Sequence, residues 1–433
     1  MELFREQKLK HILEGKRILL AGYGREGKSS HRLIQQLLPQ ADVAIAEGND
    51  NICREAAKGY DLIIKSPGIP TFIFDGICST DIITSQTDIF LRCYGDATIG
   101  VTGTKGKSTT TSLLYHALST IFKETEYSAL LAGNIGIPLF DIIPSMDDNT
   151  LVVAEFSCHQ LENIHRAPVI SILLNLFQEH LDHYRSYLDY QMAKMNIALK
   201  QSPDSLFVYC RDNADLAALA GSLSIPSTTV AYGIADTQPG QPLHWIAELP
   251  RTLVGDHNLC NILAVWHALK GFDIDHEQFA QIVGTFKALE HRMEHFADRG
   301  GIQFYNDSIS TIPQATIAAV EALPGVDTLI LGGFDRGIDY TPLVDYLATH
   351  PLRNLVFVGQ AGRRILDLWQ PHASASQRWI VSDDYAAIVD WCFANTEPGH
   401  ACLLSPAAAS YDSFKNFEER GRRFKELVQA HKC

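Results

Sequence analysis

The sequence contains no C-x-x-C pair, no long apolar run and no excess of basic residues, and each absence excludes a class of protein. Its 9 cysteines are scattered without the spacing of a metal site or a disulfide framework, which predicts reduced, mostly buried thiols. No apolar stretch approaches the ~20 residues that a membrane-spanning helix needs, and residues 1–16 lack the apolar core of a signal peptide. We therefore expect a soluble, cytoplasmic protein that does not insert into a membrane.

The charge balance argues against a role that depends on binding polyanions. With 36 Lys and Arg against 50 Asp and Glu, the formal net charge at pH 7 is −14. Nucleic acids and anionic lipids are bound by clustered basic residues, so we expect no nucleic-acid partner. An anionic small molecule would need a local basic pocket instead.

Length and patterning predict three α/β domains. A chain of 433 residues, 46% of them hydrophobic, is too long for one core at roughly 100–200 residues per domain. Short β-rich apolar runs alternate with longer amphipathic stretches, as in parallel sheets covered by helices. The alternation restarts near residues 95 and 302. Strands are predicted at residues 17–21, 43–46, 62–64, 97–101, 150–154, 169–175, 303–306, 328–331, 354–358, 379–381 and 401–404, and a return strand with a turn at residues 247–257.

A glycine-rich turn at residues 100–110 carries the strongest chemical signal. Its sequence, Gly-Val-Thr-Gly-Thr-Lys-Gly-Lys-Ser-Thr-Thr, joins a predicted strand to a predicted helix. In such a loop backbone N–H groups surround phosphate oxygens, Lys107 can reach the terminal phosphates and Ser108 can ligate Mg²⁺. Val101 stands where the general phosphate-binding loop has its first glycine, but the Gly-Lys-Ser-Thr junction still favours phosphate binding over an ordinary turn.

A second glycine-rich turn, Gly22-x-Gly-x-x-Gly27, satisfies the dinucleotide fingerprint. Glu47 lies about twenty residues beyond it, where an acidic residue would hold a ribose hydroxyl. The fingerprint reports diphosphate binding at a helix N-terminus, so NAD and a UDP group fit it equally well. A tight turn with a purely structural role is a third interpretation.

Two polar segments, residues 154–162 and 175–183, directly follow predicted strands. The carboxyl ends of parallel strands face the ligand crevice, so Glu155 and His180 could approach a metal bound to phosphates in the loop. Mg²⁺ favours oxygen ligands, and by residue type alone a structural histidine is the simpler interpretation of His180. His159 and His183 are predicted to be structural or surface residues.

Together these segments resemble the Mur ligase family over essentially the whole chain. The phosphate loop matches at residues 102–109, the metal-binding glutamate at Glu155 and the H-x-D segment at residues 180–182. Further matches are G-x-H-N-x-x-N at 255–261, H-R at 291–292 and N-D-S at 306–308. The tail at residues 403–421, Leu-Leu-Ser-Pro-Ala-Ala-Ala-Ser-Tyr-Asp-Ser-Phe-Lys-Asn-Phe-Glu-Glu-Arg-Gly, is typical of the branch that adds D-glutamate.

The resemblance implies an architecture and a reaction. Residues 1–94 would form a Rossmann-like UDP-sugar-binding domain, residues 95–291 a P-loop ATPase-like central domain with a parallel sheet, and residues 292–433 a Rossmann-like amino-acid-binding domain. The implied enzyme is an ATP-dependent ligase that joins D-glutamate to UDP-N-acetylmuramoyl-L-alanine in peptidoglycan precursor synthesis, through an acyl phosphate. We expect it to act as a monomer.

The resemblance also implies the residues that hold ATP and two Mg²⁺ ions. Lys107, Glu155, His180 and Lys194 would be catalytic, and Lys194 matches a lysine that the family carbamylates. The metal ligands would be Ser108, Glu155, His180 and the modified Lys194. The nucleotide would be held by Thr104, Lys105, Gly106, Lys107, Ser108, Thr109, Asn258, Asn261, Arg292 and Asp307.

Substrate contacts are implied in the same way. Gly24, Arg25, Gly27 and Gly68 would lie near the UDP group, and Asn134 would touch the sugar substrate. Arg336, Ser410 and Phe417 match the positions that bind D-glutamate.

Two positions depart from the family pattern. The lysine expected after N-D-S is Ile309, and the lysine expected after the strand end at residues 331–333 appears as Arg336. Arginine can bind a carboxylate in a bidentate way, whereas isoleucine cannot replace a cation.

Two rival hypotheses remain at this point. A related ligase, such as a folylpolyglutamate synthetase or one that adds another amino acid, would share the ATP loop, but the tail argues against it. An NAD-binding oxidoreductase or a nucleotide sensor would leave Glu155, His180 and Lys194 without a role.

Overall fold

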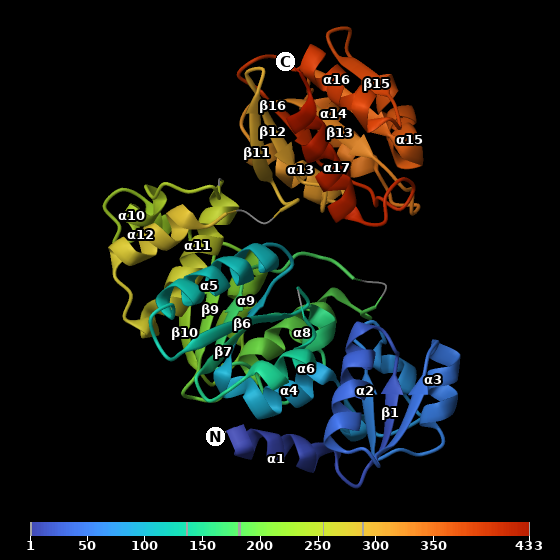
Figure 1. The fold of residues 1–433 in the computed structure, drawn as a ribbon, viewed down its shortest axis with the longest axis vertical. Helices are drawn as coiled ribbons and strands as arrows, with labels where there is room; N and C mark the ends of the chain where they lie inside the picture. The colour runs from blue at the N-terminus through green and yellow to red at the C-terminus, as the bar shows by residue number, and fades with distance from the viewer. Residues whose placement is uncertain (1, 136, 181–182, 254, 288–289, 433) are drawn as a thin grey trace. The chain divides into compact units, whose positions relative to one another are not determined.

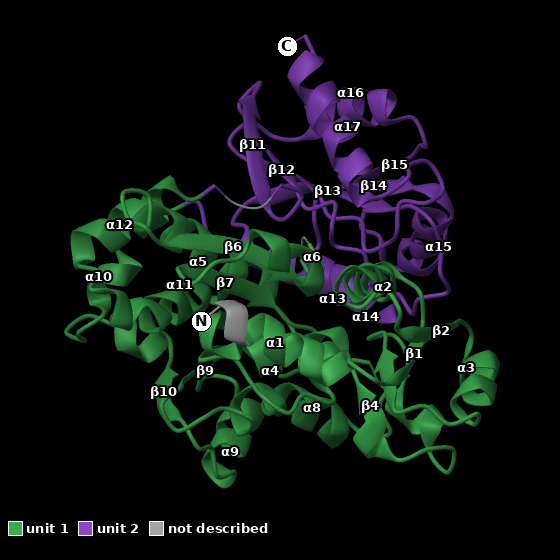
Figure 2. Ribbon diagram, turned by 60° about the horizontal axis from the view of Figure 1, so that its bottom comes forward, with its two compact units in different colours: residues 1–251, 257–286 green, residues 252–256, 287–433 purple. Residues whose placement is uncertain are grey.

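The computed structural model describes residues 2–135, 137–180, 183–253, 255–287 and 290–432. The chain forms two compact units, coloured in Figure 2. The first contains residues 1–251 and 257–286, and the second residues 252–256 and 287–433. Three sheets follow one another along the chain, two in the first unit and one in the second (Figure 1).

The first sheet has the strand order β2-β1-β3-β4, and its strands run parallel. All residues of β3 and all but the first of β1 are buried, so the middle of this sheet is covered on both faces. The strands are β1 (Arg17–Ala21), β2 (Asp42–Ala46), β3 (Leu62–Lys65) and β4 (Ile83–Thr84), and the helices are α1 (Glu2–Leu13), α2 (Arg25–Leu37), α3 (Asn49–Ala56) and α4 (Gln86–Tyr94).

The central sheet has the order β10-β9-β8-β5-β7-β6, again with parallel strands. Its middle strand, β5, is wholly buried. The strands are β5 (Thr98–Thr102), β6 (Ser128–Gly133), β7 (Thr150–Glu155), β8 (Ile170–Leu173), β9 (Leu206–Cys210) and β10 (Thr228–Tyr232). The helices are α5 (Lys107–Ile121), α6 (Leu139–Ile142), α7 (Cys158–Leu161), α8 (Tyr187–Leu199), α9 (Ala214–Ser222), α10 (His244–Ala247), α11 (Asp256–Leu269) and α12 (His276–Thr285).

The second unit contains the sheet β11-β12-β16-β13-β14-β15, in which β11 pairs antiparallel and the other strands parallel. Hydrophobic clusters lie on both faces of this sheet. The strands are β11 (Glu294–Arg299), β12 (Ile302–Asn306), β13 (Val326–Gly332), β14 (Asn354–Val358), β15 (Arg378–Val381) and β16 (Ala401–Leu404), and the helices are α13 (Pro313–Ala322), α14 (Thr341–Thr349), α15 (Gly359–Trp369), α16 (Tyr385–Asn395) and α17 (Phe417–Ala430).

Local sequence signals explain where several helices begin. Side chains of Ser85, Ser186 and Asn416 accept hydrogen bonds from backbone N–H groups in the first turns of α4, α8 and α17. Ser157 and Gln160 form a reciprocal capping box that starts α7 immediately after β7. Such caps satisfy N–H groups that a helix leaves unpaired at its N-terminus.

These observations confirm the α/β class with parallel sheets. The predicted strand at residues 247–257 is wrong, because residues 244–247 are helical and residues 248–253 form no strand. Pro250 lacks the N–H that a ladder needs; residue 254 lies outside the described residues. The prediction missed β4, β6, β9, β10 and β11. None of the helices described in the structure combines the length and apolarity of a membrane span. The exact domain boundaries remain predictions.

A buried ion pair joins the two sheets of the first unit. The Nζ atom of Lys65, at the end of β3, donates to Glu162 Oε2 at 2.8 Å and to the Ile69 carbonyl at 3.0 Å. Its side chain is 1% exposed and that of Glu162 17%. Burial opposes ionisation of Glu162, but the His183 ring, whose Nε2 lies 3.6 Å from Oε2, and the charge of Lys65 outweigh it and lower the pKa to about 2. The pair therefore ties the turn after β3 to the segment after β7.

We predict that Glu162→Gln lowers the free energy of unfolding of the first unit by about 3 kcal/mol, because it leaves the Lys65 ammonium buried without its counter-charge. Since the folded-state pKa is depressed, the wild-type contribution is present above the ordinary pKa of 4.5 and disappears as the pH falls towards about 2. Urea melts at pH 7 and pH 3 measure both effects. Glu55→Gln, which breaks the exposed pair with Lys58, is the control and should leave the midpoint unchanged. Equal effects of the two substitutions would contradict this account.

Candidate active site

The site in the first unit lies where the strands of the central sheet end. All pairs in this sheet are parallel, so the ends of β5, β7 and β8 share one edge. β7 lies on one side of β5 and β8 on the other. Chain connections therefore diverge at β5, and this edge is the position at which open α/β sheets bind ligands.

The glycine-rich loop follows β5 and leads into α5. Gly103 has φ +152° and Gly106 has φ +83°, conformations that side-chain-bearing residues rarely adopt. A Cβ atom on Gly106 would lie 2.6 Å from Asn261 Oδ1, so the glycine also allows α11 to approach the loop. The loop N–H groups and the α5 N-terminus form the anion-binding geometry that the sequence predicted.

Residues from neighbouring strands hold this loop in place. Thr104 is buried, its hydroxyl lies 2.7 Å from the Tyr190 hydroxyl, and it accepts a 2.9 Å hydrogen bond from the Phe177 N–H. The Asn175 side chain bonds both to the N–H (2.8 Å) and to the carbonyl (3.1 Å) of Lys105. Tyr190 and Asn175 were not predicted as site residues. Asn175 could have been found, because it is the last residue of the strand predicted at residues 169–175.

Two lysines converge on one carbonyl of the loop. Lys107 Nζ donates to the Gly103 carbonyl at 3.0 Å and to the Thr104 carbonyl at 2.9 Å. Lys194 Nζ, from α8, donates to the same Gly103 oxygen at 2.8 Å. Lys194 is buried, and burial together with the charge of Lys107 lowers its pKa to about 7. The loop is therefore strongly electropositive, and Lys194 has access to its neutral form near pH 7.

Glu155 is the acidic group of this edge. It ends β7 and is 2% exposed, and its Oε1 accepts a 2.7 Å hydrogen bond from Asn134 Nδ2. Its buried Oε2 accepts no hydrogen bond within the described part of the chain. A buried carboxylate oxygen without a donor fits a hard cation, so the residues present suit Mg²⁺. Asn134, expected at the sugar substrate, lies against this carboxylate.

His180 lies beside the loop-supporting tyrosine. Its φ of 58° falls in the left-handed region, and its side chain is 45% exposed. The ring centroid is 6.1 Å from that of Tyr190 and 4.8 Å from that of His159. Burial and nearby cationic groups lower the pKa of His159 to about 3, so His159 is a neutral structural residue. Asp182 of the H-x-D segment lies outside the described residues.

The N-terminal glycine turn sits against the turn after β3. Ser66 Oγ donates to the Gly22 carbonyl at 3.0 Å. A Cβ atom on Gly27 would lie 2.3 Å from the same carbonyl, whereas one on Gly24 or Gly68 would meet open space. Arg25 is exposed at the start of α2. Of the predicted UDP-facing glycines, Gly24 is exposed at the N-terminus of α2 and Gly68 is exposed in the turn after β3, whereas Gly27 is buried within α2.

Asn258 and Asn261 occupy the first turns of α11. Asn261 Nδ2 donates to Asn258 Oδ1 at 3.2 Å, and both side chains are buried. With Asn261 against Gly106, the predicted adenine-facing pair lies next to the phosphate loop.

Comparisons with known proteins agree with this geometry. Residues 101–269 match the family model of the Mur ligase middle domain. The chain is 32% identical to the UDP-N-acetylmuramoylalanine–D-glutamate ligase of Desulfitobacterium hafniense (strain Y51), covering 97% of this chain and 98% of that protein. The corresponding protein of Acidobacterium capsulatum is 30% identical, covering 97% of each chain. The chain belongs to the Mur ligase family.

Another relative in the family differs in its named amino acid. The UDP-N-acetylmuramoyl-L-alanine–L-glutamate ligase of Salinispora tropica is 32% identical, covering 96% of this chain and 98% of that protein. Among solved structures, MurF from Acinetobacter baumannii has a TM-score of 0.61 at 14% identity, with 98% of each chain covered. MurF from Thermotoga maritima, solved with ADP, has a TM-score of 0.57 at 17% identity, covering 95% of this chain and 94% of that chain. These structures show the shared three-domain Mur ligase fold.

In the second unit, Asp307 lies at the end of β12. It is 2% exposed and accepts hydrogen bonds from Ser405 Oγ at 2.7 Å and from the Met293 N–H at 3.2 Å. Burial raises the pKa of Asp307 to about 6, and the charge of Arg292 acts in the opposite direction. Asp307 and Arg292, both predicted to hold the nucleotide, are thus electrostatic neighbours.

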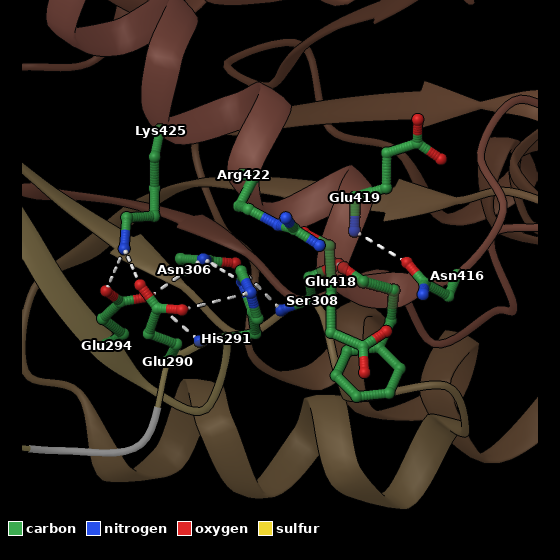
Figure 3. A network of polar contacts seen from close by, with 11 residues as sticks. Glu290, His291, Glu294, Asn306, Ser308, Asn416, Glu418, Glu419, Arg422 and Lys425 are labelled. Carbon is green, nitrogen blue, oxygen red and sulfur yellow. Dashed lines mark hydrogen bonds and ion pairs between the residues drawn. The ribbon is translucent and has the colours of Figure 1, made fainter.

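A polar network surrounds the H-R segment (Figure 3). Asn306 Nδ2 lies 2.8 Å from His291 Nδ1 and donates to Glu294 Oε2 at 3.1 Å. Lys425, from α17, pairs with Glu294 and with Glu290. Through these contacts, the segment from Glu290 to Glu294 is held against α17.

Two of the residues expected to bind the amino acid, Ser410 and Phe417, belong to the segment that leads into α17 and to its first turn. Phe417 is the first residue of this helix, and its carbonyl accepts a 2.8 Å hydrogen bond from Ser308 Oγ. Ser410 is buried, and its carbonyl accepts hydrogen bonds from the Ser413 and Phe414 N–H groups. Arg336 is exposed and donates to the Thr311 carbonyl at 3.3 Å.

Ile309 is half-buried, and its N–H donates to the His291 carbonyl at 3.1 Å. The position is therefore fixed through the backbone. Its side chain supplies no cation at the place where the family pattern has lysine.

Arg420 organises this region and was not predicted. It is 1% exposed, and its guanidinium donates to Ser308 Oγ at 2.9 Å and to the carbonyls of Ser308, Ala408 and Ala409 at 2.8–3.1 Å. One side chain thus fixes the N-D-S turn and the segment before Ser410 to α17. Arg420 belongs to the Glu-Glu-Arg-Gly stretch at the end of the tail, residues 403–421. The sequence does not show which distant residues its guanidinium contacts.

We predict that Arg420→Met destabilises the second unit by about 3 kcal/mol, because at least two buried carbonyls lose their donors. The expected readouts are a lower unfolding midpoint and altered near-UV circular dichroism. Arg423→Met, on the exposed side of the same helix, should leave both unchanged. Wild-type stability of Arg420→Met would refute the organising role of this residue.

Proposed function

We propose that the chain is an ATP-dependent ligase that joins D-glutamate to UDP-N-acetylmuramoyl-L-alanine in cytoplasmic peptidoglycan precursor synthesis. The observation that carries this proposal is the arrangement of Lys107 and Lys194 on the Gly103 carbonyl, with the buried Glu155 at the neighbouring strand end. Full-length similarity to named D-glutamate ligases supports the substrates.

The chemistry follows from the weakness of a carboxylate as an acylating agent. An oxygen of the alanyl carboxylate attacks the γ-phosphorus of ATP, the bond to the β-phosphate oxygen breaks, and ADP leaves. The glutamate amine then attacks the acyl carbon, loses a proton, and expels inorganic phosphate from a tetrahedral intermediate. Phosphorylation thus converts a carboxylate oxygen into a good leaving group.

The residues of the loop supply electrostatic stabilisation. Lys107 and the loop N–H groups would bind the β- and γ-phosphates, where charge moves during transfer. Ser108, Glu155 and His180 would hold Mg²⁺, which neutralises phosphate charge when bound. Asn134, bonded to Glu155 Oε1, would orient that carboxylate so that Oε2 faces the cation.

Lys194 fits a carbamylated metal ligand. An amine attacks CO₂ only in its neutral form, and burial beside Lys107 lowers the pKa of Lys194 to about 7. The carbamate would replace one of two neighbouring cations by an anion and supply oxygen ligands that Mg²⁺ favours.

In the second unit, the start of α17 would receive the amino acid. A helix N-terminus binds a carboxylate through its N–H groups; Phe417 is the first residue of α17, and Ser410 lies in the segment that precedes the helix. The exposed guanidinium of Arg336 would bind a second carboxylate. We place the UDP group at the Gly24–Gly27 turn and Gly68, and the ATP ribose at Asp307.

The proposal predicts phosphate release from ATP only when Mg²⁺, UDP-N-acetylmuramoyl-L-alanine and D-glutamate are all present. Lys107→Ala should lower the rate about 100- to 1000-fold, the cost of removing one preorganised donor to developing charge. Lys123→Ala, at an exposed lysine two residues beyond the end of α5, is the matched control and should retain the rate. The assay is phosphate release together with product mass.

A panel of D- and L-amino acids distinguishes the rival substrates. Activity with L-glutamate, the amino acid in the Salinispora tropica relative's name, would keep the mechanism and overturn the stereochemical assignment. Absence of phosphate release with every amino acid would overturn the ligase.

A separate prediction concerns Lys194. With ¹³C-labelled bicarbonate, the purified protein should show a carbamate carbon signal that grows as the pH rises through about 7, because the neutral amine predominates above the lowered pKa. Lys194→Arg should abolish both the signal and most of the activity. A signal unchanged by Lys194→Arg would assign the carbamate to another site.

A further inference from the structure

A pair of cysteines lies at the same sheet edge as the phosphate loop. Cys210 ends β9, and Cys260 lies in the first half of α11. Their Sγ atoms are 3.9 Å apart and share a hydrogen bond. Cys210 is buried at 4% exposure and Cys260 is half-buried. The two residues are fifty positions apart in sequence, so their spacing gave no signal.

The environment of Cys210 favours its thiolate. The hydrogen bond shared with Cys260 and those from the Asp212 and Asn213 N–H groups lower the pKa of Cys210, although burial and the Asp212 charge oppose them. In contrast, burial raises the pKa of Cys93 to about 11 and that of Cys402 well above its ordinary value. A thiolate is the reactive form of cysteine, so the lowered pKa shifts Cys210 towards its reactive form, with the sulfur of a second thiol 3.9 Å away.

A metal is a weaker interpretation of the same group. One oxygen of Asp212 lies within 4.8 Å of both sulfurs, which gives three donor atoms among the described residues. Structural zinc sites use four protein ligands. Asp212 Oδ2 also already accepts a 2.7 Å hydrogen bond from the Ile234 N–H.

The thiol pair is connected to the nucleotide site through α11. Cys260 lies between Asn258 and Asn261, and Asn261 Oδ1 packs against Gly106 of the loop. Disulfide formation requires the sulfurs to approach to about 2.05 Å. Where rotation of the two side chains does not close the 3.9 Å separation, the start of α11 has to move towards β9, which would displace the two asparagines relative to the loop.

We propose that Cys210 and Cys260 are a modification site, at which a hydroperoxide forms a reversible disulfide that weakens nucleotide binding. The inference rests on the proposed function, in which the loop and α11 bind ATP. Disulfides of this kind in reducing compartments are transient and redox-sensing.

The reaction balances with the peroxide as oxidant. The Cys210 thiolate attacks one peroxide oxygen, the O–O bond breaks, and a sulfenic acid and hydroxide form. The Cys260 sulfur then attacks the Cys210 sulfur, its proton is released, and the sulfenic oxygen leaves as hydroxide. Two thiols and one hydrogen peroxide yield one disulfide and two waters, with two electrons passing from sulfur to oxygen; an organic hydroperoxide would yield one water and one alcohol.

The test treats the full-length protein with hydrogen peroxide, followed by peptide mapping and titration with ADP and Mg²⁺. We expect a cross-linked Cys210–Cys260 peptide and ADP binding weakened by about tenfold, equivalent to one lost hydrogen bond. Dithiothreitol should reverse both changes, and Cys260→Ser should prevent them while keeping the affinity of the reduced protein. The buried pair Cys392 and Cys402 is the internal control and should remain reduced.

Three outcomes would overturn the inference. In the first, the cysteines are oxidised but no Cys210–Cys260 cross-link forms. In the second, the cross-link forms but the affinity for ADP does not change. In the third, the reduced protein contains stoichiometric zinc whose binding requires Cys210 and Cys260. A reduced protein that binds no ADP would refute the proposed function and, with it, the effect on nucleotide affinity. The peptide map would still decide whether the pair is a modification site.

Discussion

Two lysine ammonium groups from different helices donate to the carbonyl oxygen of Gly103, and the chemistry of the first unit depends on this convergence. Burial first, and the charge of Lys107 second, disfavour the protonated form of Lys194 and lower its pKa to about 7. The two lysines create a positive electrostatic potential at the point where a polyphosphate would bind. It also leaves one of the two amines able to react as a neutral nucleophile.

The rest of the first unit holds this convergence in place. Thr104 and Asn175 fix the loop to the β8 end, and Gly106 allows Asn261 to pack against it. Glu155, the neighbouring acidic group, is oriented through Asn134. The Lys65–Glu162 pair extends the same support to the N-terminal glycine turn. These contacts connect the central sheet to both predicted ligand surfaces of this unit, the phosphate loop and the N-terminal glycine turn.

Residues that follow strands directly were predictable, because a parallel sheet brings its strand ends to one edge whatever their separation in sequence. This explains why Glu155 could be found, whereas Lys107 and Ser108 were found from the Gly-Lys-Ser-Thr motif of the loop. Arg420 could not be assigned a role, since its partners lie up to 112 residues away. The Cys210–Cys260 pair was missed for the same reason.

Strand composition explains the errors in the fold. β6, Ser-Ala-Leu-Leu-Ala-Gly, consists largely of helix-forming residues, and β11, Glu-His-Phe-Ala-Asp-Arg, is a polar edge strand. Only their neighbours in the sheet make them strands. β9, Leu-Phe-Val-Tyr-Cys, has ordinary strand composition and was predictable.

The most direct test of the central claim is isotope transfer. With ¹⁸O in the alanyl carboxylate of UDP-N-acetylmuramoyl-L-alanine, the account predicts that the released phosphate carries a single labelled oxygen, because that oxygen bridges carbon and phosphorus in the acyl phosphate. Released phosphate without label, alongside normal product formation, would contradict transfer of the γ-phosphoryl group to the substrate carboxylate.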